Sequence, residues 1–148
     1  MIREWKGEEA TTDKRLATFM KAFESATGLV KVDVDYTFER YCELMSKGAI
    51  KIFISEEEDK TLQGAIGFLI TNDLHDGVKV GIELFWFVHP KYRGVGKLLF
   101  NVFEEEAKKV GCKRLAMIHL SDSYPESLEA FYLKNGYKLA EKHYVKEI

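Results

Sequence analysis

Residues 83–99, ELFWFVHPKYRGVGKLL, hold the groups in this chain whose types and spacing best suit chemistry. A strand-like run ends at Val88, and the basic, glycine-containing run that follows Pro90 opens a helical pattern. The first N–H groups of a helix have no intrahelical partner and lie at its positive pole. Glycines let that backbone approach a phosphate closely, and Arg93 and Lys97 add positive charge. The pattern predicts an anion site, with a plain strand-to-helix turn as the alternative.

Two other phosphate motifs do not fit this segment. The chain contains no GxxxxGK[ST] sequence, which argues against a nucleoside-triphosphate loop. The dinucleotide motif GxGxxG would need glycine at position 99, where the chain has Leu99. The segment also lies late in the chain, behind strands expected to be antiparallel, so a Rossmann domain is disfavoured.

Hydrophobic periodicity predicts the elements that must position this segment. Apolar residues spaced by three and four predict helices over 12–26 and 37–47. Strands are expected at residues 2–5, 49–55, 62–70 and 78–88. Because short polar turns join the last three strands, we expect them to pair antiparallel.

The second half of the chain returns to a helical period. Expected elements there are a helix along 98–110, a strand at 115–120, a short helix at 125–135, and a terminal hairpin of 137–140 and 143–146. The full order is β-α-α-β-β-β-α-β-α-β-β. This order predicts a mixed α/β (α+β) domain in which one helix crosses between parallel strands.

Composition limits the class of protein. The 148 residues suit one domain spanning 1–148, and their 22 Lys+Arg and 24 Asp+Glu give a net charge of −2. This balance disfavours a dedicated nucleic-acid binder. The longest uncharged run has twelve residues, whereas a membrane helix needs about 20, so no membrane partner is expected. Cys42 and Cys112 form neither a CxxC pair nor a disulfide framework, which favours a cytoplasmic protein.

Three stretches of the chain resemble a known family. VHPKYRGVGKLLF, then EEEAKKVGCKRL, then LEAFYLKNGYKLAE are similar to the GNAT superfamily of N-acetyltransferases, most strongly over 81–148. The HYVKEI ending is similar to phage-encoded members. The resemblance implies a GNAT-like fold, with a central, mostly antiparallel sheet, a splayed parallel strand pair and about four flanking helices. It also implies acetyl-coenzyme A as cosubstrate and no metal.

The resemblance assigns coenzyme binding to two adjacent places. The backbone near Phe87 and Val88 would pair with the pantetheine amides. The pyrophosphate would lie at the loop formed by Arg93, Gly94, Val95, Gly96, Lys97 and Leu98. The family pattern for this loop is Gln/Arg-x-x-Gly-x-Gly/Ala. Read from Arg93, Gly96 fits the pattern and Leu98 departs from it.

Glu83 is the candidate general base, because the attacking amine must lose a proton. Strand alternation places Glu83, Phe85 and Phe87 on one face and Ile82, Leu84, Trp86 and Val88 on the other. A carboxylate beside two phenylalanines should be partly desolvated, which raises its pKa. The alternative is that Glu83 faces water or pairs with Lys79.

Tyr132 is the candidate general acid by resemblance, since it matches the tyrosine of the family signature F-Y-x-K-x-G-Y. Its phenol would protonate the departing sulfur or donate a hydrogen bond to it. The alternative is a core aromatic with its hydroxyl satisfied at the rim. Tyr137 is expected to be structural.

Candidate acceptor residues lie in two regions. The resemblance implies that Asp33, Asp35 and Tyr36 border the acceptor site, where acidic groups would attract a cationic amine. Helix capping or a plain loop is the alternative for them. His119 would point into the cleft or be a satisfied core or rim histidine. The four histidines show no metal-ligand spacing, so no metal site is expected.

Together these expectations describe an N-acetyltransferase that transfers acetyl directly to a primary amine in a ternary complex. The acceptor would be a small-molecule or peptide amine, and the family resemblance implies a homodimer. The alternative is a GNAT-shaped protein that binds the coenzyme or a partner with little catalysis.

Overall fold

The computed structural model describes residues 1–24, 31–120 and 124–148. Its elements are β1 (Ile2–Glu4), α1 (Glu8–Thr12), α2 (Arg15–Lys21), α3 (Val34–Ser46), β2 (Ile50–Glu56), β3 (Leu62–Asn72), β4 (Lys79–Val88), the 3-10 turn η2 (Pro90–Tyr92), α4 (Val95–Lys109), β5 (Arg114–Ala116) and α5 (Pro125–Lys134). As far as α5 this order agrees with the predicted one, except that the short helix α1 was not expected. None of the helices in the described part of the chain has the length and apolar character that crossing a membrane requires.

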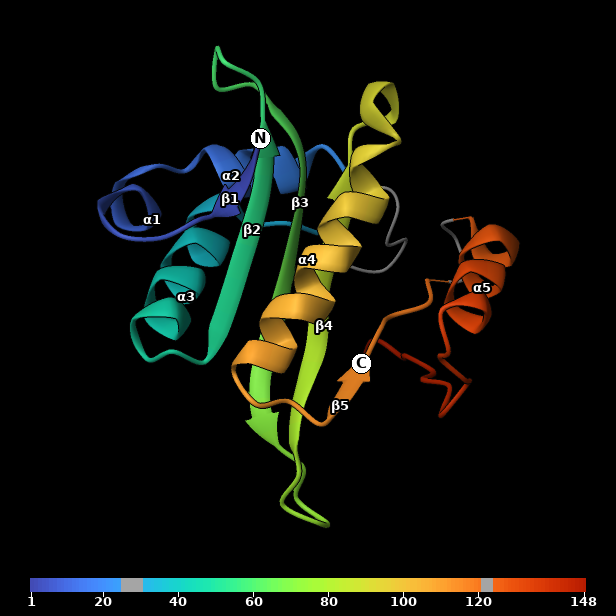
Figure 1. The fold of residues 1–148 in the computed structure, drawn as a ribbon. Coiled ribbons are helices and arrows are strands. Elements are labelled where there is room, and N and C mark those ends of the chain that lie inside the picture. Colours follow the sequence, from blue (N-terminus) through green and yellow to red (C-terminus); the bar gives the residue numbers. More distant parts are fainter. Residues whose placement is uncertain (25–30, 121–123) are drawn as a thin grey trace.

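In these residues the strands form one sheet in the order β1-β2-β3-β4-β5 (Figure 1). The first four strands pair antiparallel, and β5 pairs parallel with β4 after the crossover through α4. The parallel ladder is short, joining Val80, Gly81 and Ile82 to Arg114, Leu115 and Ala116. The mostly antiparallel sheet with one parallel pair is therefore confirmed. Beyond Ile82, the outer edge of β4 is no longer paired with β5.

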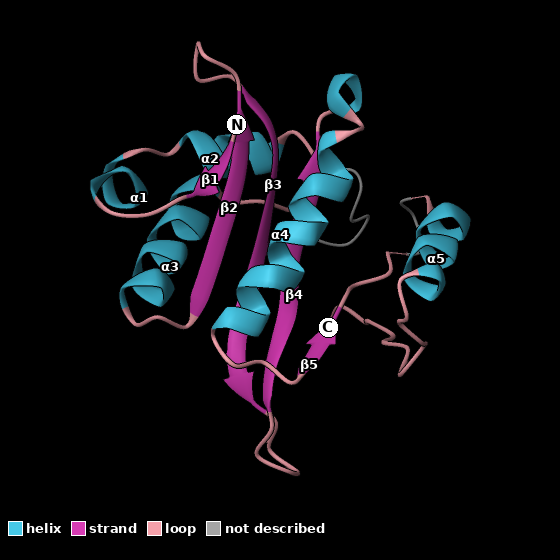
Figure 2. Cartoon of the chain, viewed as in Figure 1, coloured by secondary structure: helices cyan, strands magenta, loops and turns pink. Residues whose placement is uncertain are grey.

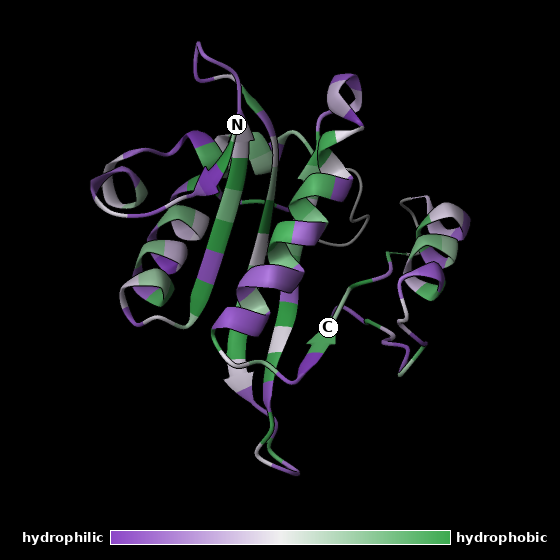
Figure 3. Cartoon of the chain, viewed as in Figure 1, coloured by the Kyte–Doolittle hydropathy of each residue, from purple (hydrophilic) through white to green (hydrophobic). Residues whose placement is uncertain are grey.

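Two layers of helices cover the sheet. α1, α2 and α3 pack on one face, over a core that includes Ile52, Ile54 and Phe85. α4 packs on the other face, over a second core that includes Phe68, Leu99 and Phe103. The central strands are mostly hydrophobic, while the C-terminal turns of α4 carry polar side chains (Figure 3). α5 lies beyond β5 at the side of the molecule (Figure 1).

A β-bulge interrupts β4 close to the predicted base. Phe68 of β3 lies opposite Glu83, but Gly67 lies opposite Phe85, so Leu84 has no partner. A bulge adds one residue to one strand and shifts the side-chain alternation beyond it. A Cβ on Gly67 would lie 2.5 Å from the Phe85 ring, so any larger residue there would have to displace the ring.

The bulge overturns the predicted alternation. Leu84 packs with Phe85 and Phe87 on the face covered by α1–α3, whereas Trp86 packs toward α4. Glu83 shares the face of its partner Phe68, which belongs to the α4 core. The expectation that Glu83 shares a face with the two phenylalanines was therefore wrong.

Several predicted boundaries also differ. The helix expected over 12–26 is the shorter α2, and α1, which ends at Thr12, was not predicted; residues 25 and 26 lie outside the described part. The strand expected at 115–120 ends at Ala116. The terminal hairpin is absent, because residues 137–148 are described without any strand (Figure 2). Alternating residues such as Leu139 and Tyr144 are instead exposed.

Candidate active site

The carboxylate of Glu83 reaches across the gap that opens between β4 and β5. Its Oε2 accepts a hydrogen bond from the backbone N–H of Ile118 at 2.9 Å, two residues after β5 ends. Glu83 is one of the few buried charged residues, with 7% of its surface exposed. Burial raises the pKa of Glu83 to about 7, although the hydrogen bond from the Ile118 N–H and the nearby Tyr132 hydroxyl act to lower it. A carboxyl group with this pKa exchanges protons near neutral pH, as a general base must.

Tyr132 also forms a hydrogen bond with Ile118, at its carbonyl group. It is buried on α5, and its hydroxyl donates to the carbonyl oxygen of Ile118 at 2.7 Å. Burial, followed by the negative charge of Glu83, raises the pKa of the Tyr132 phenol. The phenol therefore keeps its proton at neutral pH. The structure thus brings the predicted base and the predicted acid together at one peptide segment.

Aromatic side chains hold α5 in place. Phe131 lies between Trp86 of β4 and Phe100 of α4, with ring centroids 5.8 and 4.9 Å away. Tyr137 packs on Tyr132 at 5.8 Å, and its hydroxyl donates to a carboxylate oxygen of Glu104 at 3.0 Å. These contacts fix the position of Tyr132. The expected structural role of Tyr137 agrees with this arrangement.

The predicted phosphate loop forms the start of α4. Gly94 is the N-cap and Val95 the first helical residue. A Cβ on Gly96 would lie 3.4 Å from Val88 Cγ2, so the helix start packs closely on β4. Arg93 and Lys97 are exposed, and no carboxylate of the described residues forms an ion pair with either one. Two uncompensated cations therefore flank the positive pole of the helix.

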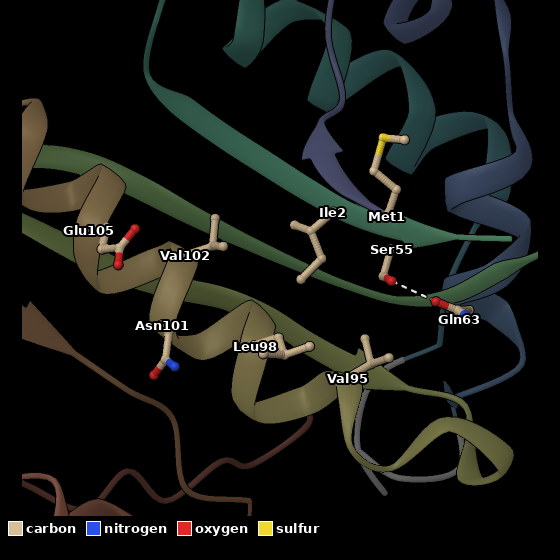
Figure 4. A pocket seen from close by; sticks show the side chains of 9 residues that line it. All are labelled: Met1, Ile2, Ser55, Gln63, Val95, Leu98, Asn101, Val102 and Glu105. Atoms are coloured by element: carbon tan, nitrogen blue, oxygen red, sulfur yellow. Dashed lines mark hydrogen bonds between the residues drawn. The ribbon is translucent and has the colours of Figure 1, made fainter.

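The side chains of Val95 and Leu98 point elsewhere. They line an open groove of about 540 Å³ between α4 and the ends of β1, β2 and β3 (Figure 4). The other lining residues are Met1, Ile2, Ser55, Gln63, Asn101, Val102 and Glu105. Neither Glu83 nor Tyr132 lines this groove, so Val95 and Leu98 can serve an anion at the helix start only through their backbone.

The end of β4 offers unpaired backbone groups next to this loop. The N–H of His89 donates to the backbone carbonyl oxygen of Gln63, at the start of β3. Because hydrogen-bonded pairs alternate along an antiparallel ladder, the backbone groups of Phe87 also face β3, and those of Trp86 and Val88 face outward. Of the two predicted strand residues, Val88 has its backbone free toward the gap. Phe87 contributes its ring to the opposite face.

Trp86 and Ile118 are site residues that the sequence did not single out. The Trp86 Nε1 atom is buried beside Gly96, and in residues 1–24, 31–120 and 124–148 it is the buried side-chain polar atom that lacks a hydrogen-bond partner. An orphaned donor beside the helix start fits a site that receives a polar ligand. Ile118 acts through its backbone, which the residue type does not reveal.

Most of the predicted acceptor residues already form hydrogen bonds or ion pairs within the protein. The Asp33 carboxylate caps α3 by accepting from the Tyr36 N–H, and Asp35 pairs with Lys14 at 2.6 Å. Tyr36 is exposed, with its ring next to the guanidinium of Arg40. His119 is exposed and its Nε2 lies 2.7 Å from the carbonyl oxygen of Pro125, at the start of α5. The capping alternative describes Asp33, and the others are engaged with neighbouring groups. No three His, Cys, Asp or Glu side chains among the described residues are grouped so that they could hold a metal ion.

Comparison with known protein families identifies the family of this chain. The profile described as "Acetyltransferase (GNAT) family" matches residues 16–137, most of the chain. The chain belongs to the GNAT acetyltransferase family. It is an N-acetyltransferase, and enzymes of this family use acetyl-coenzyme A and act on small-molecule or peptide amines. No curated protein matches the sequence.

Solved structures of acetyltransferases share the fold over their whole length. One is ribosomal-protein-alanine N-acetyltransferase from Brucella melitensis, with 18% identity, a TM-score of 0.71, and coverage of 100% of this chain and 98% of that one. Glucosamine-6-phosphate N-acetyltransferase from Arabidopsis thaliana has 22% identity, a TM-score of 0.70, and coverage of 99% and 97%. AAC(6')-Iy in complex with a bisubstrate analogue of coenzyme A has 16% identity, a TM-score of 0.74, and coverage of 100% and 97%. Because the names of these proteins indicate different acceptors, the fold does not identify the acceptor of this chain.

Proposed function

We propose that this protein transfers the acetyl group of acetyl-coenzyme A directly to a primary amine, with both substrates bound together. The observation that carries the proposal is that Glu83 and Tyr132 both form hydrogen bonds with the backbone of Ile118. It sets a titrating carboxyl and a protonated phenol on either side of one strand gap. Acetyl-coenzyme A supplies an activated thioester when bound.

The residues of this chain would divide the proton chemistry between them. Glu83 takes a proton from the amine nitrogen as that nitrogen forms its bond to the acetyl carbon. Tyr132 donates a proton to the sulfur as the carbon–sulfur bond breaks. The Glu83 carboxyl then gives its proton, directly or through solvent, to the Tyr132 phenolate, so that one proton passes in net from nitrogen to sulfur and both side chains recover their starting states.

Coenzyme binding would use the start of α4 and the end of β4. The unpaired N–H groups of the first helical turn, together with Arg93 and Lys97, suit a pyrophosphate. The outward backbone of Val88 suits an amide of the pantetheine arm, and the Trp86 indole offers a further donor. These features of α4 and β4 support the proposal that acetyl-coenzyme A binds here.

The cysteines favour direct transfer over a cysteine relay. Cys42 Sγ donates to the carbonyl of Ala10, and Cys112 is buried in the core under α4. Burial raises the pKa of both thiols, which weakens them as nucleophiles. Two free thiols also fit the cytoplasm, where we place the protein. We further propose that residues 1–148 act as one domain, because both cores lie on one sheet.

The test compares Glu83→Gln with the unaltered protein in acetyl transfer and in titration calorimetry with acetyl-coenzyme A. We expect kcat to fall by about 10²–10⁴-fold, as for loss of a general base, with the Kd for acetyl-coenzyme A within twofold. An unchanged kcat would remove Glu83 from the mechanism. Tight binding without transfer to any amine would favour a coenzyme-binding protein without catalysis.

A further inference from the structure

Three charged side chains hold the start of β5 against the turn between β3 and β4. Arg114, the first residue of β5, donates from Nη1 to Asp73 Oδ2 at 3.0 Å and from Nη2 to Asp76 Oδ2 at 2.6 Å. One planar guanidinium thus spans two carboxylates of a single turn, a fork geometry that fixes direction as well as distance. We call Arg114, Asp73 and Asp76 the Arg114 clamp. It lies at the end of the sheet where β4 and β5 both begin (Figure 1).

The turn itself orders the two carboxylates of the Arg114 clamp. Asp73 Oδ1 accepts from the N–H of His75 at 2.8 Å, and Asp76 Oδ1 accepts from the N–H of Val78 at 3.0 Å. The Oδ2 atom of each carboxylate therefore faces Arg114. An exposed ion pair usually contributes little to stability, because holding two flexible side chains in one geometry costs entropy. Partners that the turn already fixes reduce this cost, so the Arg114 clamp can hold the end of a strand.

The Arg114 clamp lies at one end of a short ladder. The pairing of β5 with β4 begins at Arg114 and ends at Ala116. Two residues further along, the Ile118 N–H is bonded to the side chain of Glu83 and not to the backbone of β4. The two strands therefore diverge from a closed end at the clamp toward an open end at Ile118. Because a short ladder frays easily, an anchor at its closed end matters for its position.

We infer that Arg114 is a positioning residue for the proposed reaction, because its clamp sets how far β5 diverges from β4 and so holds Ile118 against Glu83. The inference rests on the proposed function for the role of Glu83. Arg114 lies four residues before Ile118 and acts through the strand, not on the reacting atoms. Tyr132 shares in the effect, since its hydroxyl is bonded to the carbonyl of Ile118.

Loss of the Arg114 clamp has a defined consequence at Glu83. In Arg114→Ala the carboxylates of Asp73 and Asp76 remain close without a cation between them, and their repulsion opens the turn. β5 then frays, Ile118 withdraws, and water reaches the Glu83 carboxyl group. Burial is the main cause of the raised pKa of Glu83, so this pKa falls toward its ordinary value.

The titratable groups that face Glu83 do not confuse this effect. They are the phenols of Tyr132 on α5 and of Tyr137 just after it. Burial raises the pKa of both phenols, so neither becomes charged near neutral pH. A change in the titration of Glu83 in this range therefore reports the surroundings of its own carboxyl group.

The first experiment measures hydrogen exchange of the Ile118 amide by NMR, which requires no substrate. We expect exchange in Arg114→Ala to be at least about tenfold faster than in the wild type, because fraying exposes this amide. Arg114→Lys should lie between the two, since an ammonium group pairs with one aspartate and cannot form the fork. The Ile66 amide, on the central strand β3, is the internal reference. Unchanged exchange at Ile118, or equal acceleration at Ile66, would overturn the inference.

Arg40→Ala is the matched control for loss of an exposed arginine. The Arg40 side chain is 48% exposed against 51% for Arg114, and it pairs with Glu43 within α3, away from β5. We expect this variant to leave the exchange rate within about twofold of the wild type. Asp73→Asn combined with Asp76→Asn removes the clamp from its other side and should reproduce Arg114→Ala. If the control accelerated exchange as much as Arg114→Ala does, the clamp would not be the cause.

The second experiment follows the titration of the Glu83 carboxyl group by NMR, with its signal assigned by its absence in Glu83→Gln. We expect the midpoint in Arg114→Ala to fall by at least about half a pH unit, and in Arg114→Lys to fall less. A merely structural role for Arg114 would lower stability without moving this midpoint. An unchanged or higher midpoint would therefore overturn the inference and leave the proposed function intact. Failure of the wild type to acetylate any amine would instead contradict the proposed function, and the midpoint would still show whether Arg114 holds the strand.

Discussion

Glu83 and Tyr132 bind the two ends of one residue, because Ile118 donates its N–H to the Glu83 carboxylate and accepts the Tyr132 hydroxyl on its carbonyl. The two side chains come from β4 and α5, which are 49 residues apart in sequence (132 minus 83). Neither strand pairing nor a shared helix joins them. The Ile118 peptide segment is therefore the link between α5 and the Glu83 carboxylate.

The pH dependence of activity should follow Glu83. Only the carboxylate form accepts a proton, and burial raises its pKa to about 7. We expect kcat/KM to rise about tenfold per pH unit below pH 7 and to level above it. The rise of kcat/KM below pH 7 should be absent in Glu83→Gln. A wild-type profile that is flat from pH 5 to 8 would contradict the assignment.

The Tyr132→Phe variant should shift that profile. Its hydroxyl lowers the pKa of Glu83, so its removal should move the midpoint of the limb to higher pH. The variant also leaves the Ile118 carbonyl without its donor, at a cost of about 1–3 kcal/mol in unfolding free energy. Tyr144→Phe is the control, since Tyr144 is 92% exposed. A lower midpoint in Tyr132→Phe would refute the coupling.

Stability should depend on pH through the same carboxyl group. The pKa of Glu83 rises from 4.5 to about 7 on folding, so folding favours its protonated form. Its stabilising contribution is complete below pH 4.5 and is lost as pH rises through 7. The loss is of the order of 3 kcal/mol, from about 1.4 kcal/mol per pKa unit. Urea unfolding at pH 5 and pH 8 should show this difference in the wild type, and Glu83→Gln should lose it.

Arg93→Ala should weaken coenzyme binding through the pyrophosphate alone. The expected rise in KM for acetyl-coenzyme A is about tenfold, equivalent to one charge-assisted contact. S-acetylpantetheine has no pyrophosphate, so its KM should stay within twofold of the wild-type value. If Arg93→Ala changed both KM values equally, the guanidinium would not contact the pyrophosphate. Lys6→Ala is the control for loss of a positive charge, because it removes an exposed cation after β1.

The bulge in β4 should depend on Gly67. A Cβ there would lie 2.5 Å from Phe85 Cε1, so Gly67→Ala must displace the ring. We expect a loss of about 1–3 kcal/mol in unfolding free energy, typical of overpacking. Gly94→Ala adds a Cβ with nothing within 4 Å and serves as the control for stability. Equal stability of the two variants would show that the ring can move freely.

The sequence predicts the helix and strand order well, because amphipathic periods and turn residues are local signals. It also selects Glu83 and Tyr132, which the structure brings together at Ile118, although Glu83 lies on the other face of β4 from the one predicted. Simple alternation fails there because Leu84 has no partner on β3, and this extra residue reverses which face of the sheet each earlier side chain points to. Gly67 within an apolar strand run is a signal of such a bulge, but its register becomes visible only in the paired sheet. Ile118 could not be found from residue types, since its contribution is a peptide N–H and C=O.

The three-residue ladder between β4 and β5 leaves the proposed reaction centre beside a weakly paired edge of the sheet. Tyr132, the proposed acid, follows this ladder in the chain, and contacts made by side chains such as Glu83 and Phe131 hold its segment against the antiparallel part of the sheet. Mild denaturant should therefore release α5 and β5 while the long ladders of β2, β3 and β4 persist. Amides of Ile118 and Tyr132 would exchange with solvent early, and amides of Ile52 and Ile66 late. In such a molecule, inactivation precedes denaturation.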